Sequence, residues 1–303
     1  MRVSRMTPAN LSLLELYAAT ILMGGAPLFA KLVPVSADVL TMLRSAIGAV
    51  ALGLFIKVLG TKLSLRKRKD YLVIGVIGGV MALHWITYIH AIRVSTVAAA
   101  LIGFFTFPVL TALMEPLFFY GNGFTYKDIL SGIGIFAGAL ILAMGADTGT
   151  NIGQGLLWGM ISAILFVLRS MLLKKFMSGT NGAVAMFHQM VAIAVVLAPF
   201  SGWTQLAASV PFLSLILVFA IVFTAIAHTL YARSLAHLRP TTVSFVFSLH
   251  PLFGILFAAL FLGEIPGLST ALGGSIIVAV ALLESVRTAR AAQTLLKAVP
   301  ATQ

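Results

Sequence analysis

Apolar runs of about 20 residues recur from one end of this chain to the other. Each run is long enough to cross the hydrocarbon core of a lipid bilayer as a helix, and about twice as long as a strand of a membrane barrel needs to be. A helix also satisfies its backbone hydrogen bonds within itself, as lipid requires. The sequence therefore predicts an all-α integral membrane protein with ten transmembrane helices, at residues 12–31, 36–57, 71–92, 95–120, 127–146, 153–173, 182–200, 211–232, 241–263 and 267–286.

Charged residues are too few to cover a water-facing surface. The 303 residues are 60% hydrophobic and 9% charged, with a mean hydropathy of +1.07, whereas a soluble domain has about 25% charged residues. The chain has no cysteine, which excludes disulfides, thiol catalysis and cysteine-based metal sites. No cofactor and no metal ion is expected.

The net charge of +12 is spread unevenly around the predicted spans. If the N-terminus is cytoplasmic, sixteen of the twenty Lys and Arg residues fall on the cytoplasmic side. Only Lys31 and Arg93 fall outside, and Arg44 and Arg169 lie within spans. The positive-inside rule describes this asymmetry, so we expect the cell inner membrane with both termini cytoplasmic. The positive charge then faces the inner leaflet of the bilayer, and nucleic acid is not an expected partner.

The chain contains an internal repeat. Residues 82–120 match residues 225–263 at an offset of 143, which pairs Tyr88 with Tyr231 and Pro108 with Pro251. The predicted halves, 1–149 and 150–303, have five spans each and together form one transport domain. Because five is odd, the second copy crosses the membrane in the opposite sense, as in many secondary transporters, where such halves enclose a central site. Chance similarity among apolar helices is the alternative.

The repeat resembles the EamA type of the drug/metabolite transporter superfamily. The resemblance rests on the five-plus-five spans, a tyrosine at a helix end, a mid-helix proline before LFLGE, and the glycine-rich segments GIGIFAGALILAMG and ALGGSIIVAVALLE. It implies a transporter of small molecules. One departure is that Glu264, which ends the ninth span, aligns with Gly121 in the first half. The histidine and aromatic residues of the third span are most similar to the YddG group of amino-acid exporters.

The third span contains the segment ALHWITYIHAIR, residues 82–93. His84 and Tyr88 are four residues apart and share a helix face, with Trp85 at its shoulder. At 1.5 Å per residue His84 lies roughly 20 Å into the membrane, where ionisable groups usually face a bundle interior or water. We expect all three to line a central cavity. In the alternative interpretation, the histidine bonds a neighbouring helix and the aromatic rings only pack.

Other spans supply further candidates for substrate binding. Tyr231 occupies the position of Tyr88 in the second half, and His250 precedes a mid-helix proline. The family resemblance places several further aromatic residues in helices around the cavity: Phe104, Phe105, Phe107, Trp158, Phe166, Phe245 and Phe247. Met23 is a further candidate for substrate binding. An aromatic site with a few polar tips suits a neutral or zwitterionic ligand with an apolar side chain. The same rings could instead face lipid or neighbouring helices.

Five residues are candidate hinges or gates. Gly24, Gly25 and Pro27 lie in the segment MGGAP, which loosens the first span. Pro108 and Pro251 each remove a backbone hydrogen bond and are expected to bend their helices. The carbonyl groups so released could receive a ligand's ammonium group, or the prolines could only bend the chain. Likewise, the glycines could move as a gate or only permit close packing.

The acidic residues limit the transport mechanism. All eight map near span ends or loops: Glu15, Asp38, Asp70, Glu115, Asp128, Asp147, Glu264 and Glu284. An antiporter that exchanges cationic drugs for protons needs a deep acid. Proton coupling would have to use histidine, whose ordinary pKa is about 6.5. We expect Arg44 to extend toward the lipid headgroups, the alternative being contact with a substrate carboxylate.

These observations predict an exporter of neutral or aromatic amino acids, or of similar small metabolites, that works by alternating access. The alternatives are a proton-coupled exporter of other metabolites or drugs, and an intramembrane enzyme. An enzyme is disfavoured because the chain has neither an HExxH metal pair nor a nucleophile elbow. The expected partners are a small substrate and the lipid bilayer, and the sequence is compatible with both a monomer and a homodimer.

Overall fold

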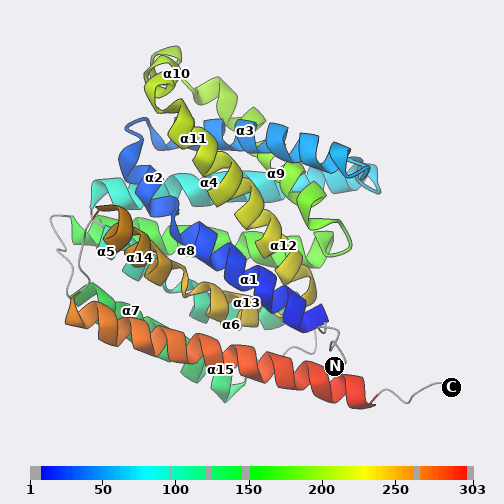
Figure 1. Cartoon of the computed structure of the whole chain (residues 1–303), viewed down its shortest axis with the longest axis vertical. Helices are drawn as coiled ribbons and strands as arrows, with labels where there is room; N and C mark the ends of the chain where they lie inside the picture. Colours follow the sequence, from blue (N-terminus) through cyan, green and yellow to red (C-terminus); the bar gives the residue numbers. More distant parts are fainter. Residues whose placement is uncertain (1–7, 96, 120–124, 145–150, 263–266, 299–303) are drawn as a thin grey trace.

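The computed structural model describes residues 8–95, 97–119, 125–144, 151–262 and 267–298, and within these ranges it contains helices and no strand (Figure 1). The first half comprises α1 (Pro8–Gly24), α2 (Ala26–Leu32), α3 (Ala37–Val58), α4 (Arg68–Val94), α5 (Val97–Phe104), α6 (Phe107–Phe118) and α7 (Tyr126–Met144). The second half comprises α8 (Ile152–Met177), α9 (Gly182–Leu197), α10 (Trp203–Ser209), α11 (Leu213–Ala220), a π-helical turn η3 (Ile221–Ile226), α12 (Ala227–His237), α13 (Pro240–Phe247), α14 (His250–Leu262) and α15 (Leu268–Ala298).

The helices are long and apolar enough for a multi-pass membrane protein, which confirms the predicted fold class. Among the described residues eight stretches qualify as membrane spans: Pro8–Phe29, Ala37–Val58, Arg68–Val94, Ala100–Phe118, Gly153–Met177, Gly182–Phe200, Val210–His237 and Ala271–Thr288. The predicted fifth span is α7, and the predicted ninth span is divided between α13 and α14.

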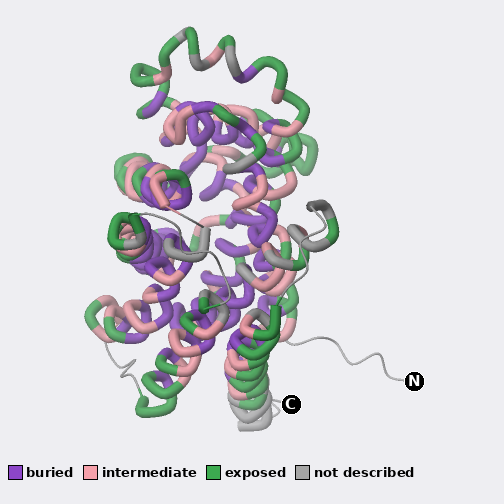
Figure 2. Tube along the Cα trace, turned by 90° about the vertical axis from the view of Figure 1, so that its left-hand side faces the viewer, coloured by how far each residue is buried: buried purple, intermediate pink, exposed green. Residues whose placement is uncertain are grey.

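Apolar side chains cover the outside of the bundle. Figure 2 shows the buried residues where helices face one another and the exposed residues around the periphery. Large apolar residues on this periphery include Val58 and Leu72, which are 84% and 77% exposed. Apolar surface of this extent is unfavourable in water and suits contact with lipid tails.

Helices of the first half pack against helices of the second in a symmetric pattern: each of the main contacts has an equivalent in which the two halves exchange roles. α4 packs along α8, and the equivalent pair is α12 along α1. α3 packs on its own counterpart α9, and α7 on its own counterpart α15. Figure 1 also shows that α1 begins and α15 ends at the same end of the bundle. The predicted boundary between residues 149 and 150 lies outside the described residues.

The two mid-helix prolines lie where a helix stops and a new one begins. α5 ends at Phe104 and α6 begins at Phe107; α13 ends at Phe247 and α14 begins at His250. These breaks are 143 residues apart, the offset of the repeat. Pro108 and Pro251 are each the second residue of the new helix, where the missing N–H removes no helical hydrogen bond. Each span is thus interrupted for two residues just before its proline, and the gating and ligand roles of these prolines stay predictions.

The first span is also interrupted, between α1 and α2. Gly25 separates the two helices, and Pro27 is the second residue of α2. A Cβ atom on Gly24 would lie 2.6 Å from the carbonyl oxygen of His250, and one on Gly25 would collide with the Phe223 ring. The two glycines thus let this segment approach α14 and η3 closely.

Candidate functional site

A cavity lies between the helices of the two halves. Its lining residues are Met23, Ala26, Arg44, His84, Trp85, Tyr88, Ile89, Phe104, Phe166, Phe219, Phe223, His228, Phe247 and His250. The space open to the centres of water molecules is about 50 Å³, and one water needs about 10–15 Å³. The cavity can therefore hold several waters or part of a small organic molecule.

His84 on α4 is fixed by a residue of α8. Its Nδ1 lies 3.0 Å from the Ser162 carbonyl oxygen and 2.8 Å from the Ser162 hydroxyl. Because a carbonyl oxygen can only accept a hydrogen bond, we assign the ring proton to Nδ1. The Ser162 hydroxyl also lies 3.2 Å from the His84 carbonyl oxygen, to which it donates. His84 thus both bonds a neighbouring helix and lines the cavity, which combines the two interpretations of this residue.

Arg44 on α3 lies in the cavity and does not extend to the headgroups. Its side chain is buried, with the guanidinium carbon 3.5 Å from the centre of the Trp85 ring and 4.8 Å from that of Phe219. A guanidinium group stacks favourably on an aromatic face. The expected snorkelling was wrong because these two rings, from α4 and α11, hold the group inside the bundle.

Four buried polar atoms in this cavity have no hydrogen-bond partner. They are Arg44 Nε, the Tyr88 hydroxyl, His228 Nδ1 and His250 Nδ1, and they come from α3, α4, α12 and α14. More than 90% of buried polar groups in proteins are paired, so each exception needs a cause. Their convergence on one cavity indicates a place for water or for a polar ligand.

A layer of packed rings closes the cavity on one side. We call Phe107, Phe166, Tyr231 and Phe247 the aromatic layer; their ring centres are 5.3–5.8 Å apart for the pairs in contact. All four rings are buried; Phe166 and Phe247 line the cavity, whereas Phe107 and Tyr231 do not. The Tyr231 hydroxyl lies 3.1 Å from that of Ser170.

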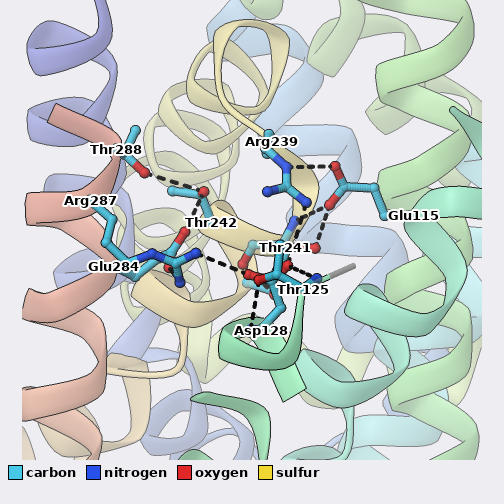
Figure 3. A network of polar contacts seen from close by, with 10 residues as sticks. Glu115, Thr125, Asp128, Arg239, Thr241, Thr242, Glu284, Arg287 and Thr288 are labelled. Atoms are coloured by element: carbon cyan, nitrogen blue, oxygen red, sulfur yellow. Dashed lines mark hydrogen bonds and ion pairs between the residues drawn. The ribbon is translucent and has the colours of Figure 1, made fainter. Parts of the chain in front are cut away.

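Figure 3 shows a network of charged and hydroxyl groups. This polar network consists of Glu115, Thr125, Asp128, Arg239, Thr241, Thr242, Glu284, Arg287 and Thr288. Along α6 it begins eight residues after Phe107, or roughly 12 Å at the helical rise. We refer to this end of the bundle as the charged end.

Among the described residues, five contacts of the polar network join the two halves of the chain. The Glu115 carboxylate accepts from Arg239 Nε at 3.1 Å, from the Thr241 backbone N–H at 3.0 Å and from the Thr241 hydroxyl. Asp128 lies 3.8 Å from Arg239 and 3.5 Å from Arg287. Placing Glu115 at the first turn of α13 also sets a negative charge against the positive end of that helix.

The remaining contacts of the network lie within one half: Thr125 and Asp128 bond each other in the first half, and the others lie in the second. Glu284 accepts from the Thr242 hydroxyl and from Arg287, both at 2.8 Å. Together these contacts tie α6 and α7 of the first half to α13 and α15 of the second. The charged end is therefore closed by ionic contacts behind a layer of rings.

The structure brings together some of the predicted site residues. Those that line the cavity are Met23, His84, Trp85, Tyr88, Phe104, Phe166, Phe247 and His250. Phe105 and Phe245 are buried and do not line it. Phe107 and Tyr231 lie behind it in the aromatic layer. Trp158 packs on the His90 ring, with 5.0 Å between ring centres, and does not line the cavity. Their roles in binding stay predictions.

Sequence reasoning favoured the lipid headgroups for Arg44, with a substrate carboxylate as the alternative, and missed the two phenylalanines of α11 and η3, Phe219 and Phe223. The hydroxyl of Thr224 bonds the Phe219 carbonyl oxygen five residues back at 2.8 Å, within the π-helical turn. Such turns are frequent at functional sites. No periodic pattern in the sequence marks this turn.

Comparison with known proteins agrees with this architecture. A solved structure titled "Crystal structure of protein" is similar to this chain, with a TM-score of 0.75 and 17% identity, over 92% of this chain and 98% of the other. At that identity the likeness shows the fold alone. No curated protein matches the chain. The EamA-like transporter family matches residues 10–144 and again residues 153–286. The chain belongs to the EamA-like transporter family.

Proposed function

We propose that this protein exports neutral and aromatic amino acids, or similar small metabolites, across the cell inner membrane by alternating access. Membership of the family indicates a membrane transporter of small molecules. The cavity and its lining support the proposed substrate class and the proposed alternating access. We further propose that the charged end faces the cytoplasm, because the positive-inside rule places both termini there.

Some pairs of residues 143 positions apart lie together at the centre of the cavity. Trp85 and His228 are such a pair; both line the cavity, and their rings lie 5.1 Å apart. Phe104 and Phe247 are another pair with both members in the lining. Equivalent residues from two inverted halves meet only near the axis that relates the halves.

Other pairs are divided between the cavity and the closed side, and this division is the observation that carries the proposal. Tyr88 lines the cavity, whereas its counterpart Tyr231 is fully buried in the aromatic layer. His250 lines the cavity, whereas its counterpart Phe107 is fully buried in the same layer. Alternating access exchanges the environments of such pairs.

In the opposite state of the transporter, we expect Tyr231 and Phe107 to line the cavity and Tyr88 and His250 to be buried. Reaching that state requires the polar network to separate, because its bonds tie the two halves together. The helix breaks after Phe104 and Phe247 are suited to absorb the change, because the prolines that follow them donate no backbone hydrogen bond.

Counterflow of labelled phenylalanine and leucine in liposomes that contain the purified protein tests the proposed substrates. We expect saturable exchange, and we expect Tyr88→Ala to reduce it while the protein stays folded. Tyr88→Phe is the matched control that keeps the ring. If the wild type exchanges none of a panel of amino acids, the substrate proposal is wrong. If Tyr88→Ala exchanges at the wild-type rate, Tyr88 only packs.

A further inference from the structure

Arg44 is a buried cation without an acidic partner. Its side chain is 4% exposed, and no described acid forms an ion pair with it. The lining of the cavity contains no carboxylate. Of the described acids, Glu115, Asp128 and Glu284 are instead paired at the charged end. The cavity as a whole therefore presents an uncompensated positive charge.

The guanidinium group is also held in place for a ligand. Trp85 and Phe219 pack on it, and its Nε has no hydrogen-bond partner. A guanidinium group matches a carboxylate through two parallel hydrogen bonds. The unpaired polar atoms of Tyr88, His228 and His250 face the same cavity, and they can bond the rest of a polar head group.

We propose that Arg44 binds the carboxylate of an organic acid and that this contact selects the substrate class. The inference rests on the proposed transport function and makes it narrower. A carboxylate with an apolar or aromatic body is accepted whether or not it carries an amino group, because no acid lines the cavity to require one. An amine without a carboxylate is rejected, because its charge repels that of Arg44.

Three compounds with the same phenylethyl body separate these possibilities: 3-phenylpropanoate, phenylalanine and 2-phenylethylamine. Ligand-dependent thermal unfolding of the purified full chain in detergent measures binding without transport. We expect the first two to raise the midpoint temperature and the amine to leave it unchanged. Equal stabilisation by the amine, or no stabilisation by 3-phenylpropanoate, overturns the proposal from the wild type alone.

Arg44→Met removes the charge and keeps a long side chain. We expect it to lower the affinity for 3-phenylpropanoate by about tenfold or more, since a hydrogen bond to a charged group is lost. Arg169→Met is the matched control. Arg169 is also fully buried and forms no ion pair with a described acid, but its Nε donates to Gln189 Oε1 at 3.0 Å and it does not line the cavity. Unchanged affinity in Arg44→Met, or an equal loss in both variants, contradicts the proposal.

Counterflow distinguishes this inference from the proposed function. If the protein binds 3-phenylpropanoate through Arg44 but exchanges no solute, the carboxylate site stands and the transport proposal fails. If it exchanges phenylalanine equally well with and without the Arg44 charge, transport stands and the carboxylate site fails.

Discussion

The polar network and the cavity both keep charged groups inside one bundle, but they do so in opposite ways. In the network, the carboxylates of Glu115 and Asp128 are each 1% exposed and meet the guanidinium groups of Arg239 and Arg287. In the cavity, Arg44 meets rings and no described acid. Burying an unpaired charge costs several kcal/mol. The ion pairs of the network hold the two halves together, whereas Arg44 is available for the carboxylate ligand that we propose.

The network also distinguishes the two ends of the repeat. The positions 143 residues after Glu115 and Asp128 are Ala258 and Ala271. The second copy of the unit therefore lacks these two carboxylates. Under the proposed alternating access, the ionic contacts at the charged end would favour the state in which Tyr88 lines the cavity.

The largest expected effect on stability comes from Glu115→Ala. This change leaves the Thr241 N–H and the Arg239 guanidinium group without their acceptor, so we expect the free energy of unfolding to fall by about 3 kcal/mol. Thermal or denaturant unfolding in detergent measures the loss. Glu15→Ala is the matched control, since Glu15 pairs with the half-exposed Arg233 and such a pair contributes under about 1 kcal/mol. Equal losses of unfolding free energy in the two variants would show that the network does not hold the halves together.

Glu115→Ala also tests whether the network keeps the charged end closed. Because the chain has no native cysteine, a single introduced cysteine can report on access of water to this end. Ser170 is buried and bonds Tyr231 on the closed side of the cavity. A single Ser170→Cys substitution should react slowly with a water-soluble thiol reagent, and adding Glu115→Ala should speed the reaction as the charged end opens. An unchanged rate of cysteine modification would mean that the network does not control opening of the charged end.

An opposite and smaller effect is expected at Arg44. Arg44→Met should raise the free energy of unfolding by about 1–2 kcal/mol, because replacing a buried unpaired charge by an apolar side chain is stabilising. Arg169→Met should lower it, since Gln189 then loses its donor. Denaturant unfolding of the two variants in parallel checks both signs. A loss of stability in Arg44→Met would assign Arg44 a structural role and remove the contrast with the network.

Ser162→Ala should have an effect of about 1 kcal/mol, the usual contribution of one neutral hydrogen bond. The serine hydroxyl links α8 to both the ring and the backbone of His84, so its loss weakens a contact between the halves beside the cavity. Ser275→Ala is the control, because that hydroxyl is exposed and bonds only its own helix. Thermal unfolding compares the two variants, and equal midpoints would mean that the His84 contact adds nothing.

The fold could be predicted because the bilayer dictates the length of each apolar run. The internal repeat added the pairing of the halves, and its two prolines marked the breaks at residues 105–106 and 248–249. The sequence also identified His84, Trp85 and Tyr88 as cavity residues, since they share one face of a helix at a depth where polar groups need partners.

The features that the sequence did not predict depend on contacts between distant segments of the chain. Arg44 taken alone on its helix could snorkel, and only the position of Trp85 on another helix explains why it does not. Glu115 and Arg239 are 124 residues apart, and no periodicity relates them. Tyr231 was expected in the cavity because it matches Tyr88. An inverted repeat, however, places equivalent residues that lie away from its axis on opposite sides of its centre, and here Tyr88 lines the cavity whereas Tyr231 does not.

The smallest expected effect tests how far the network acts as one unit. Asp128 is buried, but its partner Arg287 is 37% exposed, and their closest atoms lie 3.5 Å apart. Solvent screening should limit the coupling energy between them to under about 1 kcal/mol. A double-mutant cycle with Asp128→Asn and Arg287→Gln, measured by denaturant unfolding, gives this energy directly. A much larger coupling energy would mean that the Asp128–Arg287 pair is as well shielded from solvent as the Glu115 carboxylate. Closure at the charged end would then depend on every ion pair in the network, whereas a small value leaves the Glu115 contacts with α13 as the part that holds the halves together.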